Sequence, residues 1–237
     1  MAEKDKRKAT SGYMKSNEYK TIENYMHSCM SDSSHDREHV MRVLYTAMRL
    51  ARTEQGIDCD ILIAACLLHD IGREAQFKDP KICHAAEGAK MTEAFLRGIG
   101  WNEGRAKHVS DCIRTHRWRS DDMPKGIEAK ILFDADKLDV SGAMGIARTL
   151  MYQGEAGEPL YTVNGGSVCP GTDREDPESF YKEYNIKLKG IGAALFTEEA
   201  RRIARERSKA AEAFYNSLTQ EVSGAYAGRG ILDDCLE

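Results

Sequence analysis

The 237-residue sequence lacks the apolar run of about 18 residues that a membrane-spanning helix needs. No apolar segment follows the first methionine, so we expect no secretion signal. The seven cysteines are odd in number and form no Cys-x-x-Cys pair, which argues against a disulfide framework. These absences predict a cytoplasmic protein that has no membrane partner.

The sequence also lacks an excess of basic residues. Its 34 basic and 38 acidic residues give a net charge of −4, which does not favour a nucleic acid as partner. It contains no Walker A string and no other glycine-rich phosphate loop. A phosphorylated ligand would therefore be held by side chains or by a metal ion, and not by a backbone cradle.

Apolar residues recur at steps of three and four along most of the chain, which predicts an all-α fold. Residues 160–163 could form a short strand. The polar segment 72–82 is expected to be a loop. The expected helices are at about 17–30, 36–54, 59–70, 83–98, 103–116 and 197–219, and a further helix carries Asp136.

The length allows one large domain or two small ones. We expect a single helical domain at residues 17–225, between a flexible N-terminal tail at 1–16 and a C-terminal tail at 226–237. Glycine and proline are concentrated at about 153–178. This segment is too long for an ordinary connection, so we expect it to be an ordered insertion.

Residue types that bind metal ions recur along the chain in the order His39, His69, Asp70, His84, His116 and Asp136. The adjacent pair His69 and Asp70 follows the apolar run 61–68, which places it at the end of a buried helix. Buried imidazole and carboxylate groups need a partner, and a cation satisfies both. An acidic group is also unfavourable at a helix C-terminus, which further favours a cation beside Asp70.

The string His69-Asp70-Ile71-Gly72, with His39 before it and Asp136 after it, resembles the HD superfamily of metal-dependent phosphohydrolases. The resemblance covers about residues 34–150. The region beyond is similar to a subgroup of small soluble bacterial HD proteins that hydrolyse nucleotides. The resemblance implies an HD-type helical bundle with a C-terminal helical extension, and a divalent metal ion bound by His39, His69, Asp70 and Asp136.

Two of these ligand assignments have neighbouring competitors. His35 precedes His39 by one helical turn and could instead support a ligand from behind. Asp134 competes with Asp136, while both Asp134 and Asp139 could hold the far nitrogens of the histidines. Imidazole and carboxylate ligands do not distinguish among Mn, Fe, Ni, Co, Zn and Mg.

His84 and His116 resemble the positions that supply ligands to a second metal ion in binuclear HD proteins. With a single metal ion, they would instead contact phosphate or act as a general acid. Arg73 suits a bidentate contact with phosphate. Arg42 and Lys137 could face the same way, although a solvated surface charge explains each of them equally well.

The resemblance implies a metal-dependent phosphohydrolase that acts on a small phosphorylated molecule by metal-activated water, and a nucleotide is favoured. A di-iron HD-fold oxygenase and a non-catalytic nucleotide-binding sensor are the alternatives. Segment 153–178 is expected to cover the site or to shape a homodimer contact beside it. Tyr152, Tyr161 and Tyr181 would then offer aromatic faces to a base.

Overall fold

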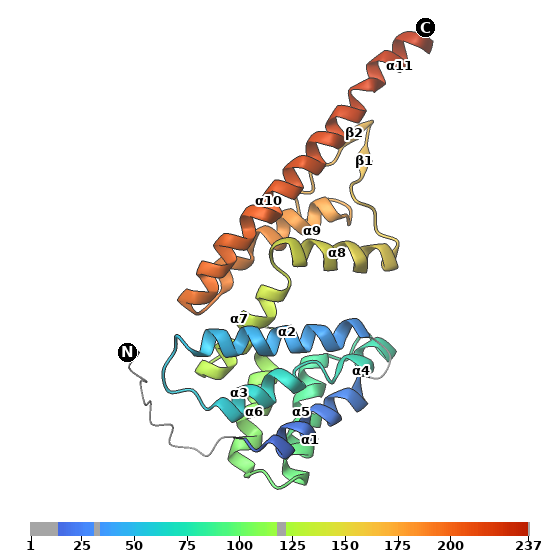
Figure 1. Cartoon of the computed structure of the whole chain (residues 1–237). Helices are drawn as coiled ribbons and strands as arrows, with labels where there is room; N and C mark the ends of the chain where they lie inside the picture. Colours follow the sequence, from blue (N-terminus) through green and yellow to red (C-terminus); the bar gives the residue numbers. More distant parts are fainter. Residues whose placement is uncertain (1–13, 31–33, 118–121, 237) are drawn as a thin grey trace, which may run out of the picture. The chain divides into compact units, whose positions relative to one another are not determined.

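The computed structural model describes residues 14–30, 34–117 and 122–236, and only the backbone at residues 34–36. Most of this part of the chain is helical, as predicted (Figure 1). Among the helices described, none combines the length and the apolarity needed to cross a membrane. The chain divides into two compact units, residues 1–135 and 136–237, where the sequence led us to expect one domain.

The first unit is a bundle of helices around the buried helix α3. Its elements are α1 (Ser16–Cys29), α2 (Ser34–Ala51), α3 (Cys59–Leu68), α4 (Arg73–Lys78), α5 (His84–Gly98) and α6 (Glu103–Thr115). Helix α3 packs against α1, α2 and α6, and α5 packs against α4 and α6. The expected loop at 72–82 was wrong in part, because its first half forms α4. Six residues are too few for a helical period to stand out in the sequence.

Helix α3 begins at a side-chain cap. Asp58 accepts hydrogen bonds from the backbone N–H groups of Asp60 and Ile61, at 3.1 and 3.2 Å. Arg105 from α6 donates to the same carboxylate at 3.0 Å. From Ile61 to Leu68 nearly every side chain is buried, so the helix is apolar on all sides. Its C-terminal end therefore lies inside the bundle.

Helix α7 (Ile127–Asp139) begins in the first unit and ends in the second. Its residues up to Ala135 belong to the first unit, and those from Asp136 onward to the second. Two of the acidic residues singled out in the sequence, Asp134 and Asp136, thus lie on either side of this division.

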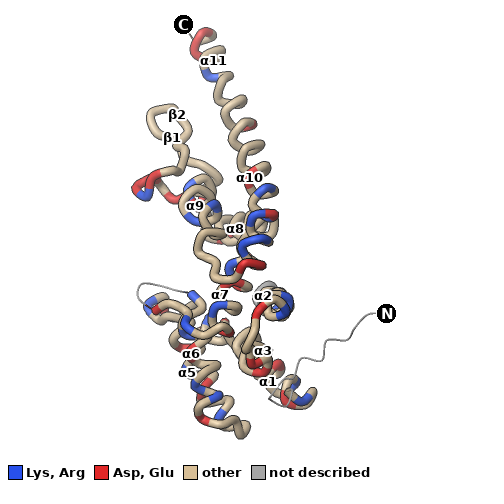
Figure 2. The backbone as a smooth tube through the Cα atoms, turned by 90° about the vertical axis from the view of Figure 1, so that its left-hand side faces the viewer, with Lys and Arg blue, Asp and Glu red and all other residues tan. Residues whose placement is uncertain are grey.

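The second unit is built along one long helix. Its elements are α8 (Gly142–Ala156), β1 (Val163–Asn164), β2 (Ser167–Val168), α9 (Phe180–Ile186), the 3₁₀ helix η1 (Leu188–Ala194), α10 (Glu198–Tyr226) and α11 (Gly228–Leu236). Helix α10 packs against α8 and η1. Charged residues gather on the first half of α10, while its second half carries few (Figure 2). Residues 228–236, expected to be part of a tail, form α11.

The glycine- and proline-rich segment is ordered within the second unit. Its start belongs to α8, and its middle forms a two-stranded antiparallel hairpin in which Val163 pairs with Val168. Tyr161 packs against Tyr181 and Tyr226, with ring centroids 5.7 and 6.0 Å apart. Tyr181 is only 1 % exposed. The expectation that Tyr181 offers a face to a ligand was therefore wrong, because its ring is part of the core.

Candidate metal centre

Five of the predicted site residues of the first unit meet in its interior. His39 comes from α2, His69 and Asp70 follow the end of α3, His84 begins α5 and His116 follows the end of α6. Each of the five is at most 1 % exposed. Side chains from residues 39 to 116 of the sequence thus form one polar cluster in an otherwise apolar bundle.

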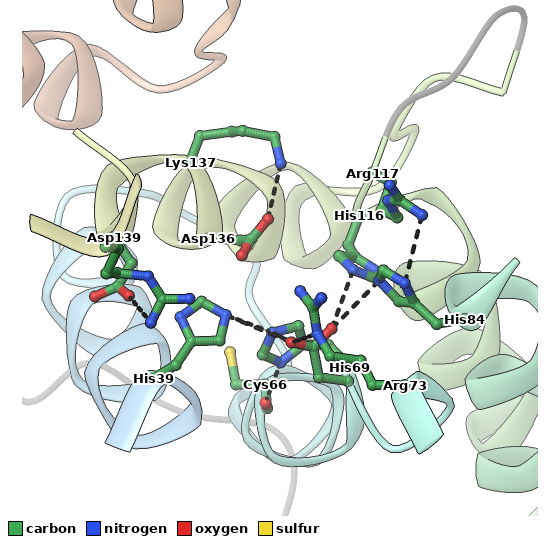
Figure 3. Close-up of polar contacts among 12 residues, drawn as sticks. His39, Cys66, His69, Arg73, His84, His116, Arg117, Asp136, Lys137 and Asp139 are labelled. Atoms are coloured by element: carbon green, nitrogen blue, oxygen red, sulfur yellow. Dashed lines mark hydrogen bonds and ion pairs between the residues drawn. The ribbon is translucent and has the colours of Figure 1, made fainter. Parts of the chain in front are cut away.

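Asp70 is the centre of this cluster. Its Oδ2 atom lies 3.6 Å from His39 Nε2 and 3.5 Å from His69 Nε2. Its Oδ1 atom lies 3.4 Å from His84 Nε2 and 3.7 Å from His116 Nε2. Figure 3 labels the four histidines that surround this centre. The carboxylate therefore faces two different pairs of histidines with its two oxygens.

The turn that carries Asp70 lies unusually close to α5. A Cβ atom at Gly72 would stand 2.3 Å from the carbonyl oxygen of His84 and 2.6 Å from the amide nitrogen of Gly88. Gly72 has φ −84°, so backbone conformation does not require a glycine there. The missing side chain of Gly72 instead allows this close approach. The approach brings Asp70 next to His84.

Hydrogen bonds fix the tautomers of two histidines. His69 Nδ1 lies 2.8 Å from the carbonyl oxygen of Cys66, and His116 Nδ1 lies 2.6 Å from that of Ile113. A carbonyl can only accept, so Nδ1 carries the proton in both rings. The Nε2 atoms of both rings therefore present lone pairs to the cluster, as histidines that bind metal ions do.

The electrostatics of the cluster keep Asp70 ionised. Burial alone would raise the pKa of Asp70, but its electrostatic interactions with His69, Arg73, His39 and His116 outweigh burial and hold this pKa well below its usual range. Arg73 is in direct contact, with its Nε atom 2.6 Å from Asp70 Oδ2. Sequence analysis expected Arg73 at a phosphate, and the structure places it on the central carboxylate.

His84, in contrast, is kept neutral. Burial lowers the pKa of His84 to about 3; Asp70 opposes this shift, while Arg73, His116 and Arg117 add to it. An ionised carboxylate and a neutral ring thus face each other across 3.4 Å. Among the described residues, neither Asp70 Oδ1 nor His84 Nε2 has a hydrogen-bond partner. Buried acceptors without a donor are costly unless a cation lies between them.

The donor set fits divalent cations. Two groups of buried ligand atoms each lie close enough together to share an ion: His39, His69 and Asp70, and Asp70, His84 and His116. Ligand atoms that are each about 2.1 Å from one ion lie roughly 3 to 3.5 Å apart, which is near the spacings measured here. Among the described residues, each of these two groups therefore has the donors and spacing to hold a divalent cation.

The remaining predicted residues lie as follows. Asp134 is fully buried on α7 in the first unit, and Arg42 is half-buried on α2. In the second unit, Asp136 is 9 % exposed and accepts from Lys137 at 2.8 Å, while Asp139 pairs with Arg148 at 3.4 Å. The side chain of His35 lies outside the described residues.

Sequence reasoning missed Gln76, whose Oε1 atom lies 2.6 Å from His84 Nδ1. It offered Asp134 and Asp139 as possible partners for the far nitrogens of the histidines or as caps of neighbouring groups, but two of these nitrogens bond to backbone carbonyls three residues earlier. The sequence contains a signal for these two, since both histidines directly follow the last residue of a helix. It contains none for Gln76, because a glutamine in a polar segment has no distinctive pattern.

Comparison with known proteins agrees with this geometry. Residues 37–141 match the HD domain. Over these residues the chain is similar to HD-domain proteins, and solved structures described as HD-superfamily hydrolases resemble most of its length. The match includes all five residues of the cluster and Asp136.

Several bacterial proteins resemble most of the chain. YpgQ of Bacillus subtilis is 29 % identical over 207 residues, which cover 86 % of this chain and 93 % of YpgQ. A crystal structure of YpgQ in complex with ADP has a TM-score of 0.67 at 26 % identity and covers 86 % of this chain and 94 % of that one. An HD-superfamily hydrolase from Bacillus thuringiensis has a TM-score of 0.66 at 26 % identity, over 87 % and 97 % of the two chains.

Proposed function

We propose that the protein hydrolyses a phosphate ester or anhydride of a nucleotide with the help of two divalent cations. The observation that carries this proposal is the position of Asp70, whose two oxygens face separate pairs of buried histidines. A carboxylate shared by two ligand groups suits a pair of cations, which together stabilise the attacking and leaving oxygens of a phosphoryl group.

The two cations would be held by residues from different helices. His39 and His69 would bind one ion, His84 and His116 would bind the other, and Asp70 would contribute to both. We include Asp136 as a further ligand, in accordance with its place in the HD motif. This set of imidazoles and carboxylates suits Mn, Fe, Co, Ni or Zn, and Mg would require more oxygen ligands.

The arginines around the cluster are suited to bind phosphate. Arg73 from α4 touches Asp70, yet 38 % of its side chain is exposed to solvent. Arg117 lies 3.4 Å from His84. Each guanidinium places positive charge beside the proposed cations. There it could bind the negatively charged phosphate groups of a substrate. Lys137 and Arg42 are further candidates for the same task.

The nucleotide is favoured because a similar protein binds one. YpgQ resembles this chain over most of its length, and one of its structures contains ADP. A nucleoside diphosphate or triphosphate combines several negative charges with a base. We therefore propose nucleotides over sugar phosphates as substrates.

Phosphate and pyrophosphate release would test this proposal. The purified protein would be analysed for metals and assayed with Mn²⁺ against nucleoside mono-, di- and triphosphates and against sugar phosphates. We expect release from nucleotides by the wild type and none above background by the isosteric Asp70→Asn variant. Iron with consumption of O₂ would instead indicate an oxygenase, and nucleotide binding without turnover would indicate a sensor. Equal activity of Asp70→Asn would refute the role of the centre.

A further inference from the structure

His84 has two neighbours that compete for its Nδ1 atom. Gln76 Oε1 lies 2.6 Å from this nitrogen, and Arg117 Nη1 lies 3.4 Å from it. An amide oxygen can only accept a hydrogen bond, whereas a guanidinium can only donate one. Gln76 therefore favours a proton on Nδ1, and Arg117 favours a lone pair there.

The distances decide between the two neighbours. A separation of 2.6 Å is that of a short hydrogen bond, while 3.4 Å lies beyond the usual range for nitrogen donors. We propose that Gln76 is a positioning residue that holds the proton of His84 on Nδ1 and thereby makes Nε2 a metal ligand. The inference deepens the proposed function, since it rests on the same metal centre.

The opposite orientation of the Gln76 amide does not fit the cluster. Its NH₂ group would then donate to His84 Nδ1, and the ring proton would move to Nε2. An Nε2–H group would have Asp70 Oδ1 as its natural acceptor, 3.4 Å away. Within the part of the chain that the structure describes, neither of these two atoms forms a hydrogen bond, so the contact lacks the geometry that this tautomer requires.

The tautomer determines what His84 can do. A ring with its proton on Nε2 donates to a phosphate oxygen or acts as an acid, whereas a ring with a lone pair on Nε2 binds a cation. His69 and His116 are fixed by backbone carbonyls, which no side-chain substitution removes. His84 depends on the side chain of Gln76 from α4. A single substitution can therefore switch its role.

The tautomer can be read directly in the metal-free, full-length protein. After treatment with a chelator, long-range ¹H–¹⁵N spectra of ¹⁵N-histidine protein at pH 7 would report which nitrogen carries each proton. We expect the proton of His84 on Nδ1 in the wild type. In Gln76→Leu, Arg117 is left to donate to Nδ1, and the proton should move to Nε2. His69 and His116 should remain unchanged and serve as internal controls.

Two matched variants separate the tautomer effect from general damage. Gln76→Glu keeps an oxygen acceptor and should keep the proton on Nδ1. Arg117→Leu removes the competing donor and should also keep the wild-type tautomer. A proton on Nε2 of His84 in the wild type, or no change in Gln76→Leu, would overturn the inference. If Gln76→Leu does not fold, the wild-type and Arg117→Leu spectra still decide.

Titration with Mn²⁺ in a calorimeter gives a second readout that is independent of turnover. Loss of a residue that orients a metal ligand typically weakens binding about 10- to 100-fold. We expect this loss for one Mn²⁺ ion in Gln76→Leu and its recovery in Gln76→Glu, while the other ion binds as in the wild type. Unchanged affinity for both ions would contradict the inference. A protein with these properties that hydrolyses no nucleotide would refute only the proposed function.

Discussion

The two units of the chain build their interiors from different chemistry. The first unit encloses four histidines and Asp70, each at most 1 % exposed. The interior of the second unit is rich in aromatic rings, including Phe180 and Tyr184, and Tyr215 stacks on Tyr184 with centroids 4.1 Å apart. Buried polar groups cost free energy unless they are paired, whereas buried rings stabilise the fold. The polar interior of the first unit thus costs folding free energy but offers ligands for cations, whereas the packing of aromatic rings stabilises the second unit.

The largest effect should come from the aromatic core of the second unit. Phe180 is fully buried, with ring centroids 6.0 Å from Phe214 and 6.4 Å from Tyr184. Phe180→Ala should lower the free energy of unfolding by about 3–5 kcal/mol, because it removes the ring and leaves a cavity. Phe180→Leu should cost less than about 1.5 kcal/mol.

Urea unfolding followed by circular dichroism would measure these differences, with Mn²⁺ titration of the folded variants in parallel. We expect the folded Phe180→Ala protein to bind Mn²⁺ as the wild type does. A weaker affinity in that variant would break the comparison, since the packing of the second unit would then contribute to the metal centre.

The next effect concerns Asp136, the first residue of the second unit. Asp136→Asn removes a charge and should weaken the binding of one Mn²⁺ ion by at least about 100-fold, since a ligand matters more than the groups that orient it. Asp134→Asn should mainly lower the free energy of unfolding, because Asp134 is fully buried. Titration calorimetry would measure the Mn²⁺ affinity of both variants, and scanning calorimetry would measure their stability. A larger loss of Mn²⁺ affinity in Asp134→Asn would reverse the assignment.

A smaller effect is expected at the close approach between Asp70 and α5. Gly72→Ala places a Cβ atom against backbone atoms that cannot turn away, so it should cost about 1–3 kcal/mol and weaken Mn²⁺ binding at His84. Gly190 of the second unit is the matched control, because a Cβ atom there meets nothing within 4 Å. Gly190→Ala should change stability by no more than about 1 kcal/mol. If thermal unfolding shows the same loss of stability in Gly72→Ala and Gly190→Ala, the packing argument is contradicted.

The smallest effect is the acid sensitivity that His84 gives to the metal-free protein. Its pKa falls from 6.5 to about 3 on folding, so the unfolded chain binds one more proton between these values. The contribution to stability is complete above pH 6.5 and is lost as the pH falls, by at most about 1.4 kcal/mol per pH unit. His84→Gln should lose this slope. Urea unfolding in the presence of a chelator at pH 7, 6 and 5 would measure how the free energy of unfolding depends on pH. The same dependence in the wild type and in His84→Gln would contradict the prediction.

The sequence was a good guide to helices that are long and bury one regular face. The expected helices at 17–30, 83–98 and 103–116 correspond to α1, α5 and α6 within a residue or two. It did not indicate α9 or η1, each of seven residues, because so short a segment shows no clear period. Nor did it set the end of the last long helix, which continues to Tyr226.

The candidate site, too, was predicted from the sequence only in part. The order of His39, His69, Asp70, His84 and His116 was sufficient to select the residues that meet in the first unit. It could not assign each histidine to an oxygen of Asp70, since that depends on which helix ends face each other. It also gave no sign that Arg73 pairs with Asp70 in the folded chain.

The sequence by itself determined the all-α class and the resemblance to HD proteins, and it predicted which side chains form the polar cluster, because helical periodicity and motif order can be read along the chain. The tertiary structure alone decided that Asp70 is shared between two pairs of histidines and that Gln76 holds His84. Both depend on the close approach of the Gly72 turn to α5, where a Cβ atom at Gly72 would stand 2.3 Å from the carbonyl oxygen of His84. Such an approach results from the packing of whole helices, and no pattern of neighbouring residues encodes its distance.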